Sequence, residues 1–279
     1  MGKIWLHGYE VNFVERNPQG SRLIVLLHGF GASTFSWLSV IDGLGELGHV
    51  IAYDRTGFGF TDKPKCWTGT NPYSIAGQTE LLAEILAHFG RGREIVLIGH
   101  SAGGQIAAHF ALLHPKDMSG LVLESPAIFN DGAARFTTVL GKLPFIDRIG
   151  LGLIGGFAKI GQRILEESFY DKTKLTESVI RGYERPLDDP DWKFGLWEFM
   201  KANKATNVKH RLRELSVPTF VLTGEHDEIV KVEQTMKVAE RIPGHRIYLV
   251  PNAGHLAHEE QPEEFTRVAS NWIKTLKTS

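Results

Sequence analysis

The feature that most constrains the fold is a serine set between glycines, where an apolar run gives way to a helix-like run. The sequence reads GHSAG at 99–103, after the apolar stretch 94–98 and before the small and apolar residues 104–111. This order predicts a strand, a sharp turn with Ser101 at its tip, and a helix. Side chains at the flanking positions would collide in such a strained turn, and glycine has none. The Ser101 hydroxyl is therefore expected to be exposed, near the positive end of the helix.

Strand-like and helix-like segments alternate along most of the chain. Apolar or alternating runs predict strands at 3–7, 10–15, 23–27, 50–53, 94–98, 120–124, 219–223 and 246–250. Helical spacing predicts helices at 33–47, 74–89, 103–113, 232–241 and 262–276. This alternation indicates βαβ units, so we predict an α/β fold with a mainly parallel, eight-stranded sheet and helices on both faces. The sequence NPQG predicts a hairpin-like turn between the second and third strands.

The alternation stops in a segment rich in large apolar side chains without strand-like spacing. We interpret this segment as a helical cap inserted after the sixth strand, which would exclude water and line an apolar pocket over the strand ends. Alternatively, its aromatic residues only hold the cap helices together. The expected division is 1–126 and 213–279 for the core and 127–212 for the cap. Candidate pocket residues are Gly29, Phe136, Leu140, Trp197 and Leu256.

Reactive side chains follow two further strands, because Asp227 lies in the loop after 219–223 and His255 in the loop after 246–250. In an open parallel sheet the carboxyl ends of strands share one edge, so these residues can converge on Ser101. A serine hydroxyl needs a base at neutral pH, and imidazole is suited to that task. We predict Ser101 as nucleophile, His255 as base and Asp227 as the orienting carboxylate. The nearby acids Glu225 and Glu228 compete for the last role.

A tight loop, HGFG at 28–31, follows the strand at 23–27. Such a loop can direct backbone N–H groups toward a developing alkoxide, which they stabilise most in the transition state. The candidate oxyanion-hole donors are the N–H groups of Phe30 and of Ala102. The alternative is an ordinary turn that ends a strand and contains a structural histidine.

The chain order Ser101, Asp227, His255, with LLHGFG at 26–31 and GHSAGG at 99–104, resembles the α/β-hydrolase superfamily. The resemblance covers nearly the whole chain and extends to YDRTGFG at 53–59 and to the tail at 254–265. It implies an α/β-hydrolase fold and serine-hydrolase chemistry. Our leading expectation is a serine carboxylesterase that hydrolyses small to medium apolar esters through an acyl-enzyme.

Other activities of the same superfamily stay open. Hydrolases similar to those of meta-cleavage products break carbon–carbon bonds with a similar Ser, His and Asp set, but there a tryptophan commonly follows the histidine, whereas this chain has Leu256. Dehalogenase and epoxide hydrolase relatives use an aspartate nucleophile, against which Ser101 argues. Perhydrolase side activity is a further alternative. A receptor or scaffold that keeps the fold and little turnover is an alternative from another class.

Composition restricts the partners and the location. The formal net charge is −1 and no Lys/Arg-rich run occurs, so we expect neither nucleic acid nor an anionic membrane as a partner. No apolar run approaches the roughly 18 residues of a spanning helix, and residues 1–8 lack the apolar segment of a secretory signal. We expect a cytoplasmic protein with no membrane span, a monomer or homodimer that takes a small-molecule ester as substrate.

Several other residues are expected to be structural. No strand ends in GxGxxG or a GK[ST] loop, so no nucleotide is implied. His255 and His258 lack a closely spaced third ligand, so we predict no metal and no cofactor, with His258 at the surface. The single Cys66 excludes an internal disulfide and is expected to be a surface thiol. Asp54 and Arg55 are expected to form an ion pair that pins their loop, with binding of a charged substrate as the alternative.

Overall fold

Eight strands form one sheet in the order β1-β2-β4-β3-β5-β6-β7-β8 in this computed structural model, which describes residues 1–129, 157–202 and 206–276. Strands β3 to β8 run parallel to one another, while β2 pairs antiparallel with both β1 and β4. The predicted mainly parallel sheet is confirmed. The strands are β1 (Gly2–Leu6), β2 (Tyr9–Arg16), β3 (Arg22–Leu27), β4 (His49–Tyr53), β5 (Glu94–His100), β6 (Gly120–Glu124), β7 (Thr219–Gly224) and β8 (Arg246–Val250).

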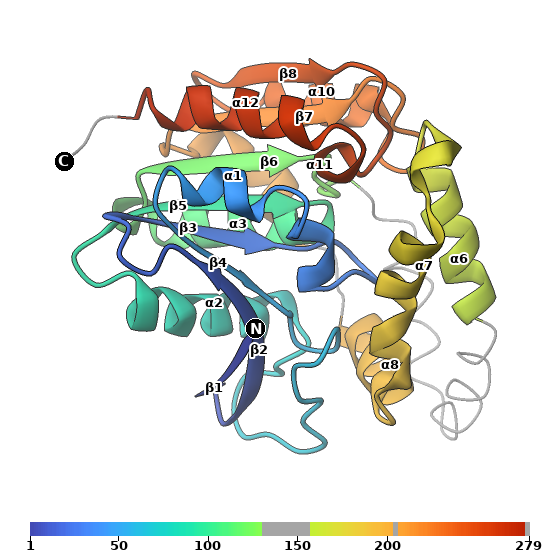
Figure 1. Ribbon diagram of the computed structural model, residues 1–279. Helices are drawn as coiled ribbons and strands as arrows, with labels where there is room; N and C mark the ends of the chain where they lie inside the picture. Colours follow the sequence, from blue (N-terminus) through green and yellow to red (C-terminus); the bar gives the residue numbers. More distant parts are fainter. Residues whose placement is uncertain (130–156, 203–205, 277–279) are drawn as a thin grey trace.

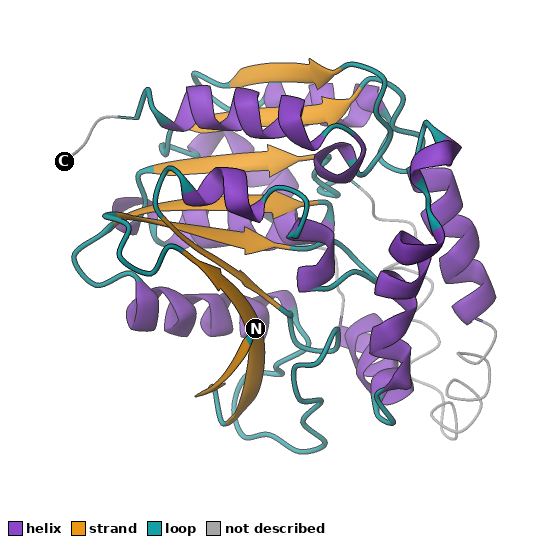
Figure 2. Cartoon of the chain, viewed as in Figure 1, coloured by secondary structure: helices purple, strands orange, loops and turns teal. Residues whose placement is uncertain are grey.

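Helices connect the strands and cover both faces of the sheet (Figure 2). The α-helices of the described residues are α1 (Ile41–Gly45), α2 (Ile75–Phe89), α3 (Ala102–Leu113), α6 (Phe157–Ser168), α7 (Glu177–Glu184), α8 (Trp192–Ala202), α9 (Val208–Arg211), α10 (Val232–Ala239), α11 (Ala257–Glu260) and α12 (Pro262–Ile273). Short 3₁₀ helices are η1 (Thr34–Trp37), η2 (Pro115–Asp117), η3 (Lys172–Lys174), η4 (Arg185–Asp188) and η5 (Leu212–Glu214).

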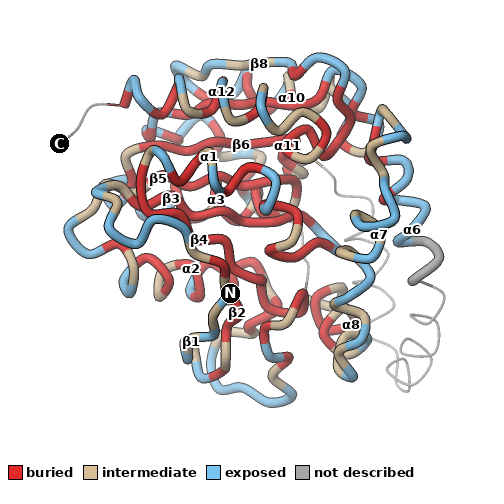
Figure 3. Tube along the Cα trace, in the orientation of Figure 1, coloured by how far each residue is buried: buried red, intermediate tan, exposed pale blue. Residues whose placement is uncertain are grey.

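Two apolar cores lie on opposite faces of the sheet because successive strand side chains point to opposite sides. Within β3, Leu23, Val25 and Leu27 pack with α2, α3 and α10. Ile24 and Leu26 pack with η1, α1 and α12. The central strands are therefore buried along their length, as Figure 3 shows.

Two local predictions were wrong. Segment 17–20 does form a turn, with the Gly20 N–H donating to the Asn17 carbonyl at 3.0 Å. It does not form a hairpin, because β4 lies between β2 and β3 and pairs with both. The single helix expected at 33–47 is divided into η1 and α1. Glycines at 43, 45 and 48 account for the short α1, because glycine weakens a helix.

Helices α6 to α9 come between β6 and β7 in sequence. Figure 1 shows α6, α7 and α8 beyond the carboxyl ends of the strands, where a cap is expected. The predicted pocket residues Phe136 and Leu140 lie outside the described residues. Within the part of the chain that the structure describes, no helix has both the length and the apolar character needed to span a membrane.

Candidate functional site

Ser101 lies at the sharp junction of β5 and α3, with φ 53° and ψ −117°. Residues other than glycine seldom adopt a positive φ, so the surrounding contacts must hold this backbone geometry. The Ser101 N–H donates to the Glu124 carbonyl at 2.9 Å, and its own carbonyl accepts from the Ala127 N–H at 3.1 Å. A Cβ on Gly103 would lie 2.2 Å from the Leu27 carbonyl oxygen, so only glycine fits there.

The Ser101 side chain is less exposed than the sequence suggested. The residue keeps 7% of its surface accessible. It faces the edge of the sheet where the parallel strands end, because it directly follows β5. The turn predicted for this residue is thus found in the structure.

The His255 ring pairs with Asp227. The Nδ1 atom of His255 lies 2.9 Å from Oδ2 and 3.1 Å from Oδ1 of Asp227. Both residues are buried, with 5% and 3% of their surfaces exposed. The alternative acids Glu225 and Glu228 are exposed. Among the three acids of this loop, Asp227 is therefore the one paired with His255.

Further donors fix the Asp227 carboxylate. Oδ1 accepts the backbone N–H groups of Ile229 at 3.0 Å and Val230 at 2.9 Å, and Oδ2 accepts the Thr223 hydroxyl at 3.2 Å. Burial raises the pKa of Asp227, but the His255 charge and hydrogen bonds that include those of His255 and Val230 outweigh it and leave the pKa below its ordinary value. A carboxylate that stays charged can hold the imidazole in one tautomer.

His255 is linked to the residue that precedes Ser101. The Nε2 atom of His100 lies 3.0 Å from the His255 carbonyl oxygen, and the two ring centroids are 4.6 Å apart. Burial, together with nearby imidazoles, lowers the pKa of His100 well below its ordinary value, so neutral Nε2–H is the donor. Among the described residues, no hydrogen bond joins the Ser101 hydroxyl to the His255 ring. Contact between them stays a prediction, and such bonds often tighten only when substrate binds.

The loop at 28–31 passes directly against Ser101. A Cβ on Gly29 would lie 3.2 Å from the Ser101 Cβ and 2.8 Å from His100 Nδ1, so a side chain at position 29 would collide. Within residues 1–129, 157–202 and 206–276, the N–H groups of Phe30 and Ala102 donate no hydrogen bond. Both donors can therefore serve a developing oxyanion. Their role as an oxyanion hole stays a prediction.

Arg55 fixes the conformation of the loop at 28–31. Its guanidinium, fully buried, donates to the carbonyls of His28 at 2.8 Å and Gly29 at 2.9 Å, and to the Gln78 side chain at 2.7 Å. Burial lowers the pKa of Arg55 to about 10. Because the two carbonyls point toward Arg55, the loop is held in one conformation.

Asp54 does not form the expected ion pair with Arg55. Its carboxylate instead accepts the N–H of Thr34 at 2.6 Å, the N–H of Phe60 at 2.8 Å and the Asn12 amide at 2.7 Å. Burial raises the pKa of Asp54, partly offset by these bonds. The predicted ion pair was therefore wrong. Asp54 and Arg55 each fix loop backbone, but through separate hydrogen-bond partners.

Glu260, which the sequence reasoning missed, joins the His255 loop to the segment after α6. Its buried carboxylate accepts the N–H groups of Gly254 at 2.5 Å, Tyr170 at 3.0 Å and Asp171 at 2.8 Å. The His255 N–H also donates to the Ser168 carbonyl at 2.7 Å. A glutamate at the end of a short helix next to a glycine-containing loop was the available signal.

The predicted pocket residues lie in different surroundings. Gly29 contacts Ser101 as described. Leu256 is 4% exposed and packs with Leu165 in α6 and with Phe169, which directly follows α6. Trp197 in α8 is 8% exposed. Their role in a substrate pocket stays a prediction.

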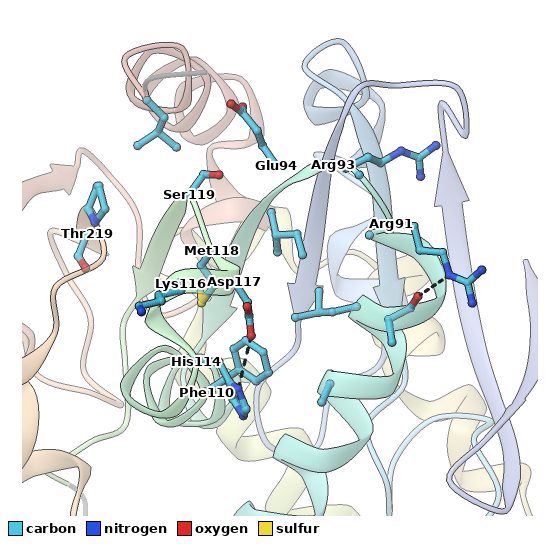
Figure 4. A pocket seen from close by; sticks show the side chains of 18 of the residues that line it. Arg91, Arg93, Glu94, Phe110, His114, Lys116, Asp117, Met118, Ser119 and Thr219 are labelled. Atoms are coloured by element: carbon cyan, nitrogen blue, oxygen red, sulfur yellow. Dashed lines mark hydrogen bonds and ion pairs between the residues drawn. The ribbon is translucent and has the colours of Figure 1, made fainter. Parts of the chain in front are cut away.

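A cleft of about 1030 Å³ lies at the opposite edge of the sheet, where β5 to β8 begin (Figure 4). None of the predicted site residues lines it. Arg91 and Arg93 at its rim donate to the carbonyls of Ala87 at 3.4 Å and Phe89 at 2.8 Å, at the carboxyl end of α2. Cations there complement the negative end of the helix, so their charge needs no ligand to explain it.

The described residues contain no group of three His, Cys, Asp or Glu side chains placed to hold a metal ion. The site is instead a serine at a strained strand–helix turn, a His–Asp pair, and a loop with two unused N–H donors. These groups lie at the carboxyl edge of a mainly parallel sheet. Fold and site together define an α/β protein with a hydroxyl group, an imidazole–carboxylate pair and backbone N–H donors at one edge of its sheet.

A family model of the alpha/beta hydrolase fold matches residues 22–262. The chain therefore belongs to the α/β-hydrolase family and is a hydrolase of that family. The resemblance found in the sequence is confirmed.

Individual relatives agree with this assignment. The chain is 31% identical over 277 residues to a putative 2-succinyl-6-hydroxy-2,4-cyclohexadiene-1-carboxylate synthase of Bacillus subtilis (strain 168), covering 96% of each chain. An esterase from Thermogutta terrifontis has a TM-score of 0.81 at 24% identity, covering 100% of both chains. A meta-cleavage product hydrolase from Pseudomonas fluorescens IP01 has a TM-score of 0.78 at 20% identity, covering 99% of this chain and 98% of that one. At these identities the two structures show likeness of fold alone.

Proposed function

We propose that this hydrolase is a serine carboxylesterase that uses Ser101, His255 and Asp227. The observation that carries the proposal is the buried His255–Asp227 pair, 2.9 Å apart, tied through His100 to the turn that presents Ser101. A lone serine would be a weak nucleophile at neutral pH, and this pair is the base that it lacks.

In the proposed reaction, the Ser101 hydroxyl attacks the ester carbonyl carbon while His255 takes its proton. The carbonyl oxygen becomes an alkoxide that accepts hydrogen bonds from the N–H groups of Phe30 and Ala102. His255 then gives the proton to the departing alcohol, which leaves an acyl group on Ser101. Water attacks this acyl-enzyme with His255 as base, and the acid product leaves as Ser101 recovers its proton.

The surroundings favour apolar substrates. The Phe30 ring is 42% exposed and lies 5.7 Å from the rings of Phe58 and Phe199, centroid to centroid. Phe199 belongs to α8, one of the helices beyond the strand ends. We assign residues 127–212 to a cap that would bring such apolar surface over Ser101, and we infer small to medium apolar esters as the substrates.

Replacing the proposed nucleophile tests the assignment. Ser101→Ala is expected to lower kcat for p-nitrophenyl esters on the order of 10⁴- to 10⁶-fold. A fluorophosphonate should label the wild-type protein at Ser101 and leave the variant unlabelled. Activity across a panel of acyl-chain lengths would define the substrate class. Retention of most ester turnover by Ser101→Ala would refute the proposal.

Carbon–carbon bond hydrolysis is the second candidate. It is favoured by the fold likeness to the meta-cleavage product hydrolase, and the same three residues could carry it. Leu256 stands where such enzymes commonly have a tryptophan, which argues against it. A dienone acid tested beside the ester panel distinguishes the two activities. Turnover of the dienone without ester turnover would make carbon–carbon bond hydrolysis the better supported function.

A further inference from the structure

A second His–carboxylate pair, Glu124 with His258, lies beneath the proposed catalytic residues. His258 Nδ1 is 2.8 Å from the Glu124 carboxylate, and the His258 backbone N–H donates to the same carboxylate at 3.1 Å. Both residues are fully buried, which corrects the expectation that His258 lies at the surface. The surface expectation failed because the His258 ring packs against Trp37 of η1 and Phe265 of α12.

Glu124 favours the protonated form of His258. Burial lowers the pKa of His258, but the Glu124 charge and hydrogen bond outweigh it and leave the pKa above its ordinary value. The His258 ring also stacks on Trp37, with centroids 4.3 Å apart. Burying an ion pair seldom stabilises a protein more than apolar side chains of the same size would. Stability is therefore a weak explanation for this pair.

Glu124 contacts both halves of the proposed catalytic machinery. Its backbone carbonyl accepts the Ser101 N–H at 2.9 Å, and it stands opposite His100 in the β5–β6 register. Its side chain holds the backbone three residues beyond His255. Glu124 thus connects the turn of the nucleophile to the loop of the base.

His100 supplies a second connection between the same two segments. Its Nε2–H donates to the His255 carbonyl at 3.0 Å, and its ring centroid lies 5.1 Å from that of His258. The rings of His255, His100 and His258 therefore follow one another from the site into the core. A shift of His258 would reach His255 through the backbone between them and through His100.

We propose that Glu124 and His258 are positioning residues that set the placement of His255 relative to Ser101. The inference rests on the function proposed above, because in that mechanism His255 must lie close enough to Ser101 to take its proton. Glu124 and His258 would maintain that distance. A misplacement of about 1 Å in such a geometry can lower a rate about 100-fold.

Two substitutions remove the charge and keep a hydrogen-bonding group at each position, although His258→Asn also removes the ring that stacks on Trp37. Glu124→Gln keeps an acceptor for the His258 N–H, and His258→Asn keeps an amide donor near the position of Nδ1. For each we expect kcat for a p-nitrophenyl ester to fall about 10- to 100-fold, with KM changed less than about twofold. The rate of fluorophosphonate labelling at Ser101 should fall by the same factor. The kcat of the double variant should be little lower than that of the more affected single variant, because both substitutions disrupt the same pair.

The matched control is Glu94→Gln. Glu94 pairs with Arg22 at 2.8 Å across β3 and β5, at the end of β5 remote from Ser101. This control should lower the melting temperature without changing kcat or the labelling rate. If Glu124→Gln and His258→Asn behave as this control does, the pair is structural only and the proposal is overturned.

Other outcomes also decide the question. Failure of both variants to fold would make the pair a determinant of the fold and overturn a separate positioning role. Absence of labelling at Ser101 in the wild-type protein would overturn the proposed function and, with it, this inference. Normal wild-type labelling with unchanged variant rates would overturn this inference alone.

Discussion

At the scale of single residues, the site depends on which acid reaches His255. Asp227 is held by the backbone N–H groups of two residues that follow it, which is a local arrangement available to a short acidic side chain. The exposed neighbours Glu225 and Glu228 make no such contacts with His255 among the described residues.

Asp227→Asn is expected to lower kcat about 10⁴-fold, because the amide cannot stabilise an imidazolium and favours the wrong tautomer. Steady-state ester hydrolysis would measure the loss. Glu225→Gln and Glu228→Gln serve as controls in the same loop and should retain wild-type kcat. A large loss in either control, with Asp227→Asn active, would transfer the role to a glutamate.

At the level of residues, the sequence indicates where a side chain lies in the fold when that residue follows a strand in a recognisable pattern. Ser101, Asp227 and His255 each follow a strand, so parallel topology alone brings them to one edge. His258 and Glu260 could not be placed in this way, because their contacts depend on a short helix that the pattern did not reveal. Glu124 carried a usable signal, since a charge that ends a wholly apolar strand needs a buried partner.

At the scale of elements, the loop of His255 and the segment after α6 form one hydrogen-bonded unit. Glu260 bonds to both, and the Tyr170 ring stacks on His226 with centroids 3.8 Å apart. His226 directly precedes Asp227 in the chain. Movement of the segment after α6 would therefore displace the loops that contain His255 and Asp227.

Glu260→Gln is expected to loosen this unit, because one carboxylate oxygen becomes an NH₂ group that faces backbone donors. Hydrogen exchange measured by mass spectrometry should speed up in peptides that contain Tyr170, Asp171 and Gly254. Glu264→Gln is the control, since Glu264 bonds to Arg267 at 2.6 Å on the outer face of α12. Equal exchange in the two variants would show that Glu260 does not tie the segments together.

Element types were predicted more reliably than their connections. The eight strands were found near their expected positions, because strongly apolar runs bounded by turns define strands well. The second and third strands were wrongly paired, since nothing local in NPQG shows that β4 will come between them. Pairing is decided by which strands share a buried face across the whole sheet.

At the scale of the whole molecule, buried ionisable groups make stability depend on pH. Glu259 is buried against α7, where its carboxylate accepts the Tyr183 hydroxyl. Burial raises the pKa of Glu259 to about 7, partly offset by His258 and Tyr183, while Glu124 and Glu260 add to the rise. The His258 ring lies 3.8 Å from Glu259.

The raised pKa of Glu259 means that the folded protein binds a proton more tightly than the unfolded chain does. Its contribution to stability is therefore complete below the ordinary pKa of 4.5 and is lost as the pH rises through about 7. His258, whose pKa is also raised, acts in the same direction as the pH increases. Asp227 acts oppositely, because its lowered pKa gives stability that is lost only as the pH falls below its ordinary value of 3.8.

Between pH 5 and pH 8 the Glu259 contribution to the free energy of unfolding should therefore decrease, on the order of 1–3 kcal/mol. The buried rings of His28 and His100 act oppositely, because burial lowers their pKa values and their contribution rises with pH. Glu259→Gln should remove the Glu259 contribution, so that from pH 5 to pH 8 its free energy of unfolding rises relative to that of the wild-type protein, because glutamine keeps a hydrogen-bonding group beside Tyr183 but cannot lose a proton. Urea denaturation at pH 5, 6, 7 and 8 measures the slope for the wild-type protein and the variant. Glu225→Gln, a substitution at an exposed site, should keep the wild-type slope. If Glu259→Gln also keeps it, the charge of Glu259 is stabilised in the folded protein as well as in water, and the prediction is contradicted.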